Sequence, residues 1–322
     1  MKAIKSMNLL KKIGLFLSTF YILPFVSFAN AETKVVTSIK PLHSLVSYVM
    51  EGVGTPDIII DGSSSPHTFQ LKPSHASMLQ EADIIFWIGE DLEVFLETPL
   101  DSIAKNVKRV TLMDSNEIDL LKFREKNVFD DHDEHGDEHD EHSDEHDDHH
   151  DGHAHGEFDI HFWLDPEIAK TIVSIVAREL SEIDVANKST YEANAKKAIN
   201  DLDTLITETR SKINSDATYI VFHDAYQYFE KGFGIEVIGA LTVNPEALPG
   251  AKQLAEIREV IEHEKVNCLF SEPQFNPSIA TTIAQDTGIK ASVLDPLGAE
   301  LDPGKDLYFD LIGDMASSLE SC

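Results

Sequence analysis

Residues 188–214 read KSTYEANAKKAINDLDTLITETRSKIN. Their apolar positions recur at the 3.6-residue period of an amphipathic helix. The stripe consists of Ala195, Ile199, Leu202, Leu205, Ile206, Thr209 and Ile213. About 26 helical residues make a rod of roughly 40 Å, the length of a whole small domain. We therefore predict a rigid connector between two halves of the molecule rather than a flexible linker.

On both sides of this segment, short β-branched runs alternate with helical patterns. The strands predicted before it are Lys34–Ile39, Asp57–Ile60, Asp83–Ile88 and Val107–Leu112, and those after it are Thr218–Phe222, Ile235–Leu241, Val266–Phe270 and Ile289–Leu294. The helices predicted between and after them are Pro41–Met50, Pro73–Glu81, Leu92–Ala104, Pro166–Ile183, Asp224–Lys231, Gly250–Glu264, Pro277–Asp286 and Lys305–Ser318. Such alternation predicts mainly parallel sheets flanked by helices.

The fold class expected is therefore α/β with two lobes, residues 32–187 and 215–322, joined by the helix 188–214. Ligands of open α/β sheets bind beyond the carboxyl ends of the strands. With two lobes, the natural site is the cleft between them.

The first 31 residues resemble a secretory signal peptide. Four lysines precede an apolar run from Ile13 to about Phe28, and Ala29-Asn30-Ala31 has the small-x-small form of a cleavage site. We expect cleavage after Ala31; an uncleaved membrane anchor is the alternative. No later segment has about 18 consecutive apolar residues, so the mature chain is expected in solution in the periplasm.

The composition changes abruptly at Asp130–Gly156. This tract contains nine His and thirteen Asp or Glu, and no Lys, Arg, Val, Ile or Leu. It has nothing to bury, so we expect a disordered loop. Closely spaced imidazoles and carboxylates bind divalent cations loosely, which suggests a capture or sensing tether. The alternative is a solubilising acidic loop.

The whole chain is strongly acidic, with 57 Asp and Glu against 26 Lys and Arg and a net charge of -31. That balance argues against nucleic acid as a partner, because phosphates attract basic side chains. It is compatible with a cationic ligand, whose local concentration a negative surface raises.

Cys268 and Cys322 are the two cysteines. Two cysteines in an exported chain usually pair, and a bridge closing a loop of about 55 residues would contribute roughly 4 kcal/mol on the chain-entropy estimate. Two free thiols or a cysteine metal site are the alternatives, although a metal site lacks a C-x-x-C pair.

Three histidines and one aspartate occupy positions suited to a cleft ligand. His67, His223 and Asp295 follow predicted strands, and His161 lies between the acidic tract and a helix. Three imidazoles with a carboxylate or a water suit tetrahedral Zn²⁺. The remaining histidines outside the tract lie in helical segments and are interpreted as structural or solvent-facing: His43, His75 and His263.

Five motifs in the mature chain are similar to those of the zinc-binding subunits of bacterial ABC importers, the ZnuA-like family. They are Pro66-His67 with Leu71–Ser74, His161–Glu167, Val221–Tyr226, Ser271–Phe275 and Leu294–Gly298. The resemblance implies two α/β lobes held by a rigid helix, with Zn²⁺ in the cleft as the transported ligand. It implies His67, His161 and His223 as ligands, Asp295 at the fourth corner and a membrane permease as partner. A disulfide like Cys268–Cys322 occurs in similar subunits, and we expect a monomer.

Two positions bear on the metal. Some zinc-branch members carry Glu directly before the first ligand His, where this chain has Pro66, so the fourth ligand is either Asp295 or a water. Manganese-type relatives tend to place a carboxylate where this chain has His223, and three neutral nitrogens favour Zn²⁺ over the harder Mn²⁺. A secreted zinc hydrolase is the rival class, but there is no H-E-x-x-H motif, so we expect no enzyme.

Overall fold

The computed structural model describes residues 32–124, 156–213, 217–242, 245 and 249–322. The expected signal peptide and nearly all of the acidic tract Asp130–Gly156 lie outside the described residues. Residues 32–322 form one compact unit. Within the described residues, no helix is long and apolar enough to cross a membrane.

The N-terminal half contains a four-stranded parallel sheet in the order β2-β1-β3-β4. Its strands are β1 (Val35–Thr37), β2 (Asp57–Ile58), β3 (Ile84–Trp87) and β4 (Lys108–Thr111). The helices between them are α1 (Lys40–Val49), α2 (Pro73–Glu81) and α3 (Val94–Ser102). The central strands β1 and β3 are buried throughout, as expected of parallel strands covered on both faces.

The C-terminal half repeats this topology with the order β6-β5-β7-β8, again all parallel. Its strands are β5 (Tyr219–His223), β6 (Gly239–Thr242), β7 (Cys268–Ser271) and β8 (Lys290–Val293). The helices between them are α6 (Gln227–Phe233), α7 (Ala251–His263) and α8 (Ser278–Thr287). The prediction of two parallel sheets flanked by helices is therefore confirmed.

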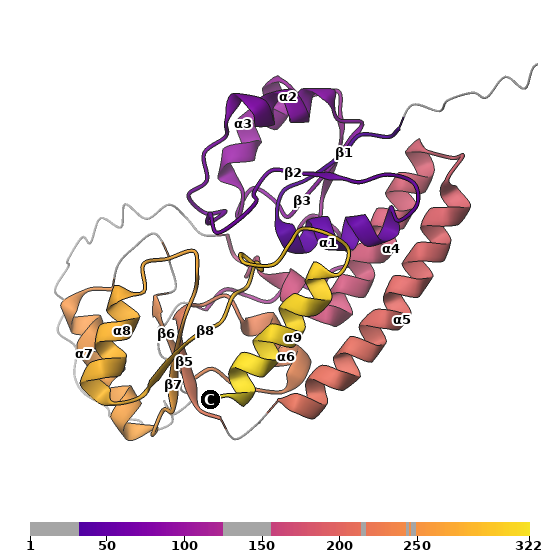
Figure 1. Cartoon of the computed structure of the whole chain (residues 1–322). Helices are drawn as coiled ribbons and strands as arrows, with labels where there is room; N and C mark the ends of the chain where they lie inside the picture. The colour runs from indigo at the N-terminus through magenta and orange to yellow at the C-terminus, as the bar shows by residue number, and fades with distance from the viewer. Residues whose placement is uncertain (1–31, 125–155, 214–216, 243–244, 246–248) are drawn as a thin grey trace, which may run out of the picture. The chain divides into compact units, whose positions relative to one another are not determined.

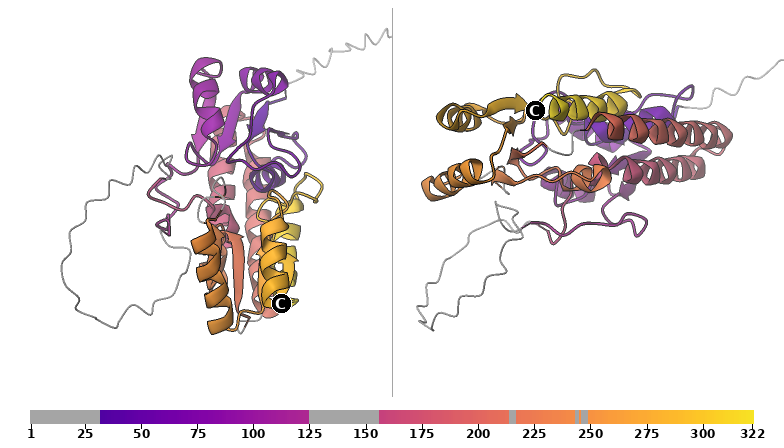
Figure 2. Two further views of the ribbon diagram at one scale, coloured as in Figure 1. Left: turned by 90° about the vertical axis from the view of Figure 1, so that its left-hand side faces the viewer. Right: turned by 90° about the horizontal axis from the view of Figure 1, so that it is seen from below.

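Long helices connect the two halves. Helix α5 (Lys188–Lys212) packs against α4 (Pro166–Ile183) and α1 of the N-terminal half and against α9 (Leu307–Glu320) of the C-terminal half. Figure 1 shows α5 running past both sheets, and the views in Figure 2 show α4, α5 and α9 alongside one another. The expected connecting helix is thus present but does not act alone, because α4 and α9 share the connection.

The apolar stripe of α5 explains this packing. Five of its seven positions are buried and two are half-buried; the buried ones are Ala195, Leu202, Leu205, Ile206 and Thr209. A rod of 25 residues at about 1.5 Å per residue is roughly 37 Å long. Relative movement of the two sheets would therefore strain one continuous packed helix.

Direct contacts also tie the halves together. Lys40 at the start of α1 is only 3% exposed, and its Nζ donates to the carbonyl oxygens of Ala299 at 3.1 Å and Leu301 at 2.5 Å. Ser44, one turn later, donates through Oγ to the Lys305 carbonyl at 3.0 Å. The loop after β8 is therefore anchored to the first helix of the chain.

The expected disulfide joins Cys268 of β7 to Cys322, with an S–S distance of 2.00 Å and a Cα–Cα distance of 5.9 Å. It ties the end of α9 to a central strand of the second sheet.

Candidate metal centre

His67 lies in the loop between β2 and α2. Gly62 at the start of this loop has a φ of +80°, a backbone conformation that side chains disfavour. Ser65 Oγ accepts a hydrogen bond from the His67 backbone N–H at 3.3 Å, which fixes the local turn. The His67 side chain is half-buried and comes from the first sheet's side of the site.

His161 precedes a short 3₁₀ helix, η1 (Phe162–Leu164), and is 3% exposed. One oxygen of Asp159, Oδ1, accepts from the His161 backbone N–H at 2.9 Å and from the ring Nδ1 at 2.8 Å. A proton on Nδ1 leaves Nε2 free as a lone-pair donor. Burial, together with the nearby His223, holds the pKa of His161 well below its usual value, so this ring is neutral at physiological pH.

His223 is the last residue of β5 and is also 3% exposed. Its Nδ1 lies 3.3 Å and 3.4 Å from the two carboxylate oxygens of Glu272, just past β7. Burial lowers the pKa of His223, but the charge and hydrogen bond of Glu272 outweigh burial and leave the pKa raised. The second imidazole thus also has a buried carboxylate behind it.

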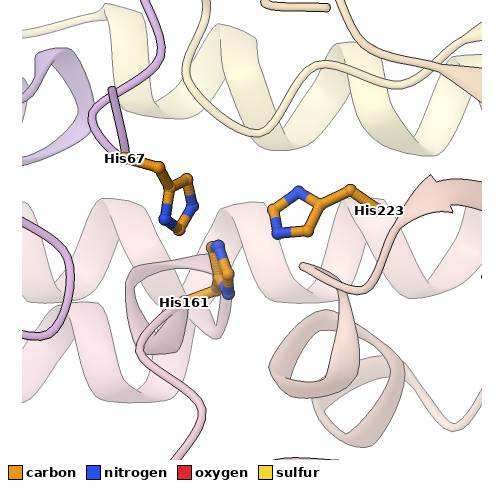
Figure 3. Close-up of side chains that lie close together, drawn as sticks. All are labelled: His67, His161 and His223. Carbon is orange, nitrogen blue, oxygen red and sulfur yellow. The ribbon is translucent and has the colours of Figure 1, made fainter. Parts of the chain in front are cut away.

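The three rings converge from segments nearly 100 and 60 residues apart in sequence. Figure 3 shows His67, His161 and His223 pointing toward one another. Their ring centroids are 4.9–5.8 Å apart, and one nitrogen of each lies within 4.8 Å of the others. Tetrahedral zinc with bonds of about 2.1 Å needs nitrogens about 3.4 Å apart, a contraction that small loop movements provide.

A small cavity of about 10 Å³ lies between these rings. Its wall contains residues of both halves: Ser65, Pro66, His67, His161, Trp163, His223, Glu272, Gln274, Phe275, Pro296 and Leu297. Such a space is far smaller than the sites that enclose organic ligands.

Asp295, the expected fourth ligand, is not brought into this group. Its Oδ1 accepts from the Leu297 backbone N–H at 3.0 Å and from Gln274 Nε2 at 2.9 Å, and its Oδ2 accepts from the Ala299 N–H at 2.5 Å. The carboxylate therefore caps the loop that follows β8. The strand-end position was predicted correctly, but the side chain turns back onto its own loop.

The remaining histidines outside the tract lie away from this centre. Buried His43 has its Nε2 3.1 Å from the Pro56 carbonyl, His75 Nδ1 accepts from the Lys72 N–H at 3.2 Å, and His263 has an 85% exposed side chain. These positions agree with their interpretation as structural or solvent-facing.

Sequence reasoning missed the carboxylates behind His161 and His223. Asp159 lies two residues before His161, a spacing that allows one carboxylate to reach both the backbone and the ring. Glu272 lies in the Ser271–Phe275 motif, just past a strand, where the strand-end rule could have found it. Carboxylate–histidine pairs of this kind orient the imidazole and raise its basicity toward a metal.

This donor set fits Zn²⁺. Three imidazole nitrogens with an open fourth position match a common zinc geometry, and a set without hard oxygen ligands disfavours Ca²⁺, Mg²⁺ and Mn²⁺. The carboxylates of Asp159 and Glu272 hold the rings of His161 and His223 in place in the absence of an ion. Binding therefore loses less conformational entropy than it would with mobile side chains.

Comparison with known proteins agrees with this chemistry. The family model described as "Zinc-uptake complex component A periplasmic" matches residues 35–322. The High-affinity zinc uptake system protein ZnuA of Brucella abortus is 45% identical over 327 residues, covering 96% of this chain and 98% of that protein.

Solved structures share the fold. A crystal structure of ZnuA superimposes with a TM-score of 0.73 at 22% identity, covering 91% of this chain and 99% of that one. A 138–173 deletion mutant of ZnuA with zinc bound gives a TM-score of 0.70 at 22% identity, covering 90% and 97%. Since the family model spans nearly the whole described chain, the protein belongs to the family of periplasmic zinc-uptake component A, the ZnuA family.

Proposed function

We propose that this chain is the periplasmic, high-affinity Zn²⁺-binding component of an ABC-type importer, and that it delivers zinc to the membrane permease. The ligands are His67, His161 and His223. The observation that carries the proposal is the convergence of three imidazole nitrogens within 4.8 Å, two of them on rings held by buried carboxylates. Family membership supports the same conclusion.

The setting of the site follows from the sequence. Export would occur through a signal peptide cleaved after Ala31, and the mature chain would act as a monomer with lobes 32–187 and 215–322. The acidic tract Asp130–Gly156 would collect zinc loosely near the tight site, because its imidazoles have no fixed geometry.

Capture and release would involve small movements. Helix α5 contacts helices of both halves, which favours small shears and loop rearrangements over a wide hinge. The His67 loop is the candidate for movement, since His67 is half-buried whereas His161 and His223 are buried. Docking of the permease on both lobes would loosen the site by displacing that loop.

Calorimetry with a chelator competitor tests the ligand assignment. In a chain lacking Asp130–Gly156, we expect one tight zinc, lost in His223→Ala and retained in the control His263→Ala, whose side chain is exposed. Unchanged zinc affinity in His223→Ala would refute the proposal. Deleting the tract alone separates a metal buffer, which would lose most binding, from an importer subunit, which keeps the tight site.

A zinc hydrolase remains the rival, because catalytic zinc also has three protein ligands and an open position. We propose that the chain is not an enzyme, because its family is one of zinc-uptake components. Ester and peptide hydrolysis by the zinc-loaded protein, measured against the His223→Ala variant, would overturn this.

A further inference from the structure

The polar atoms of the cavity wall are few. Apart from the three imidazoles, most side chains that line it are apolar, and the indole N–H of Trp163 already donates to the Pro296 carbonyl at 2.9 Å. Ser65 Oγ accepts from the His67 backbone. The Glu272 carboxylate lies against His223 Nδ1, on the side of that ring away from a metal bound at Nε2. Gln274 is the remaining polar side chain of the wall.

The orientation of the Gln274 amide is determined by its neighbour. Asp295 Oδ1 lies 2.9 Å from Gln274 Nε2, and an ionised carboxylate only accepts hydrogen bonds, so the nitrogen of the amide must face Asp295. The oxygen of the amide, Oε1, then points away from Asp295. Gln274 lines the cavity and Asp295 does not, so the amide oxygen, opposite the nitrogen held by Asp295, is the end of this side chain available to a ligand in the cavity.

That oxygen has an unmet requirement. Gln274 Oε1 is buried and accepts no hydrogen bond from any described residue. A buried acceptor without a donor costs on the order of 1–3 kcal/mol, so proteins rarely retain one without a use. A water bound to zinc is a strong donor, and the open fourth position of a three-histidine site is where such a water binds.

We infer that Gln274 completes the metal site by accepting, through Oε1, a hydrogen bond from the water in the fourth coordination position of Zn²⁺. Asp295 is the positioning residue that holds the amide in this orientation and is not itself a ligand. The inference rests on the proposed function, and it assigns roles to two residues outside the histidine trio.

A double-mutant cycle tests it, with zinc affinity measured by chelator competition on the full mature chain. Gln274→Leu removes the acceptor and should weaken zinc binding about 10-fold, the usual effect of one lost hydrogen bond to a charged group. Asp295→Ala should cause a similar loss, and the double variant should lose little more, because both changes act through the same water. Gln80→Leu, on the exposed face of α2, is the matched control and should bind zinc normally.

The visible spectrum of the Co²⁺-loaded protein provides a second measurement. Four-coordinate cobalt absorbs strongly, and we expect Asp295→Ala to keep those bands, since the three nitrogens and the water remain. A loss of affinity in Asp295→Ala far larger than in Gln274→Leu, with collapse of the bands, would instead identify Asp295 as a ligand and overturn the inference. Thermal unfolding of the metal-free variants identifies any that are destabilised. For those variants, the Co²⁺ bands, rather than the zinc affinity, determine whether Asp295 is a ligand.

The outcome for His223→Ala separates the two levels of argument. If that variant loses the tight site while Gln274→Leu binds zinc like the control, only the role of Gln274 fails. If His223→Ala also binds normally, the proposed function fails with it.

Discussion

The carboxylate behind His161 gives the sharpest test of how this fold produces affinity. Asp159→Asn keeps the shape of the side chain and its acceptor oxygen but removes the negative charge 2.8 Å from His161 Nδ1. Loss of such a partner typically weakens metal binding by about 10- to 100-fold, or about 1.4–2.7 kcal/mol. We expect Glu272→Gln to have the smaller effect, because its oxygens lie 3.3 Å and 3.4 Å from His223.

The pH dependence of this effect follows from the pKa of Asp159. Burial raises it to about 6, with partial compensation from the His161 N–H, so the carboxylate is charged at pH 7.5 and largely neutral at pH 5. Zinc binding favours the charged form, so the wild type loses its advantage over Asp159→Asn as the pH falls through 6. The ratio of the two zinc affinities should therefore shrink toward one at pH 5.

Competition titrations with a chelator at about pH 7.5, 6.5 and 5 on both proteins measure that ratio. Equal affinities at pH 7.5 would refute the orienting role of Asp159. A ratio that stays constant with pH would show that the charge of this carboxylate does not matter.

Three further predictions concern stability. Burial raises the pKa of Glu93 to about 7 in the folded state. Between about pH 4.5 and 7 the folded state therefore binds one proton more than the unfolded state, and the free energy of unfolding falls as the pH rises through that range. Replacing the carboxyl by an amide in Glu93→Gln should recover up to about 3 kcal/mol of that free energy at pH 8. Denaturant unfolding at pH 5 and pH 8 checks this. Replacing both Cys268 and Cys322 by Ser, which opens a bridge across 54 residues, should cost up to about 4 kcal/mol in the same assay. Lys40→Met leaves two carbonyls without a donor and should cost about 2 kcal/mol, with Lys34→Met, whose ion pair is exposed, as the nearly neutral control.

Each of these has a clear contrary result. If the free energy of unfolding of Glu93→Gln changes with pH as it does in the wild type, a group other than Glu93 is responsible for the pH dependence. If the variant without the disulfide unfolds with the same free energy as the wild type, the bridge contributes nothing to stability. Equal effects of the Lys40 and Lys34 substitutions would remove the special role of the buried amine between the lobes.

The course of the chain was largely predictable. Each strand in the described residues falls on one of the predicted apolar runs, and the boundaries differ by a few residues because β-branched runs extend beyond the paired positions. The strand ends alone also predicted that His67 and His223 lie at the carboxyl edges of the two sheets. Periodicity carries this information, since it reports which face of an element is buried.

The unpredicted features are side-chain directions and contacts between distant segments. Asp295 occupies the expected position, yet its oxygens bind Leu297 and Ala299 amides, a choice set by the turn after β8 rather than by any pattern. The contact of buried Lys40 with the Ala299 carbonyl joins residues 259 apart. No local spacing encodes such a pair, because it exists only once both halves are folded.

The dispersal of the three imidazoles has a consequence for biogenesis. A chain emerging from its N-terminus presents His67 first, then the histidine-rich tract and His161, and then His223, while the disulfide must wait for Cys322. A chain that has not yet reached His223 lacks one of the three imidazoles and therefore has no tight site to fill. Retention of zinc against a chelator therefore reports that the chain has been made beyond His223 and that its two sheets have folded together.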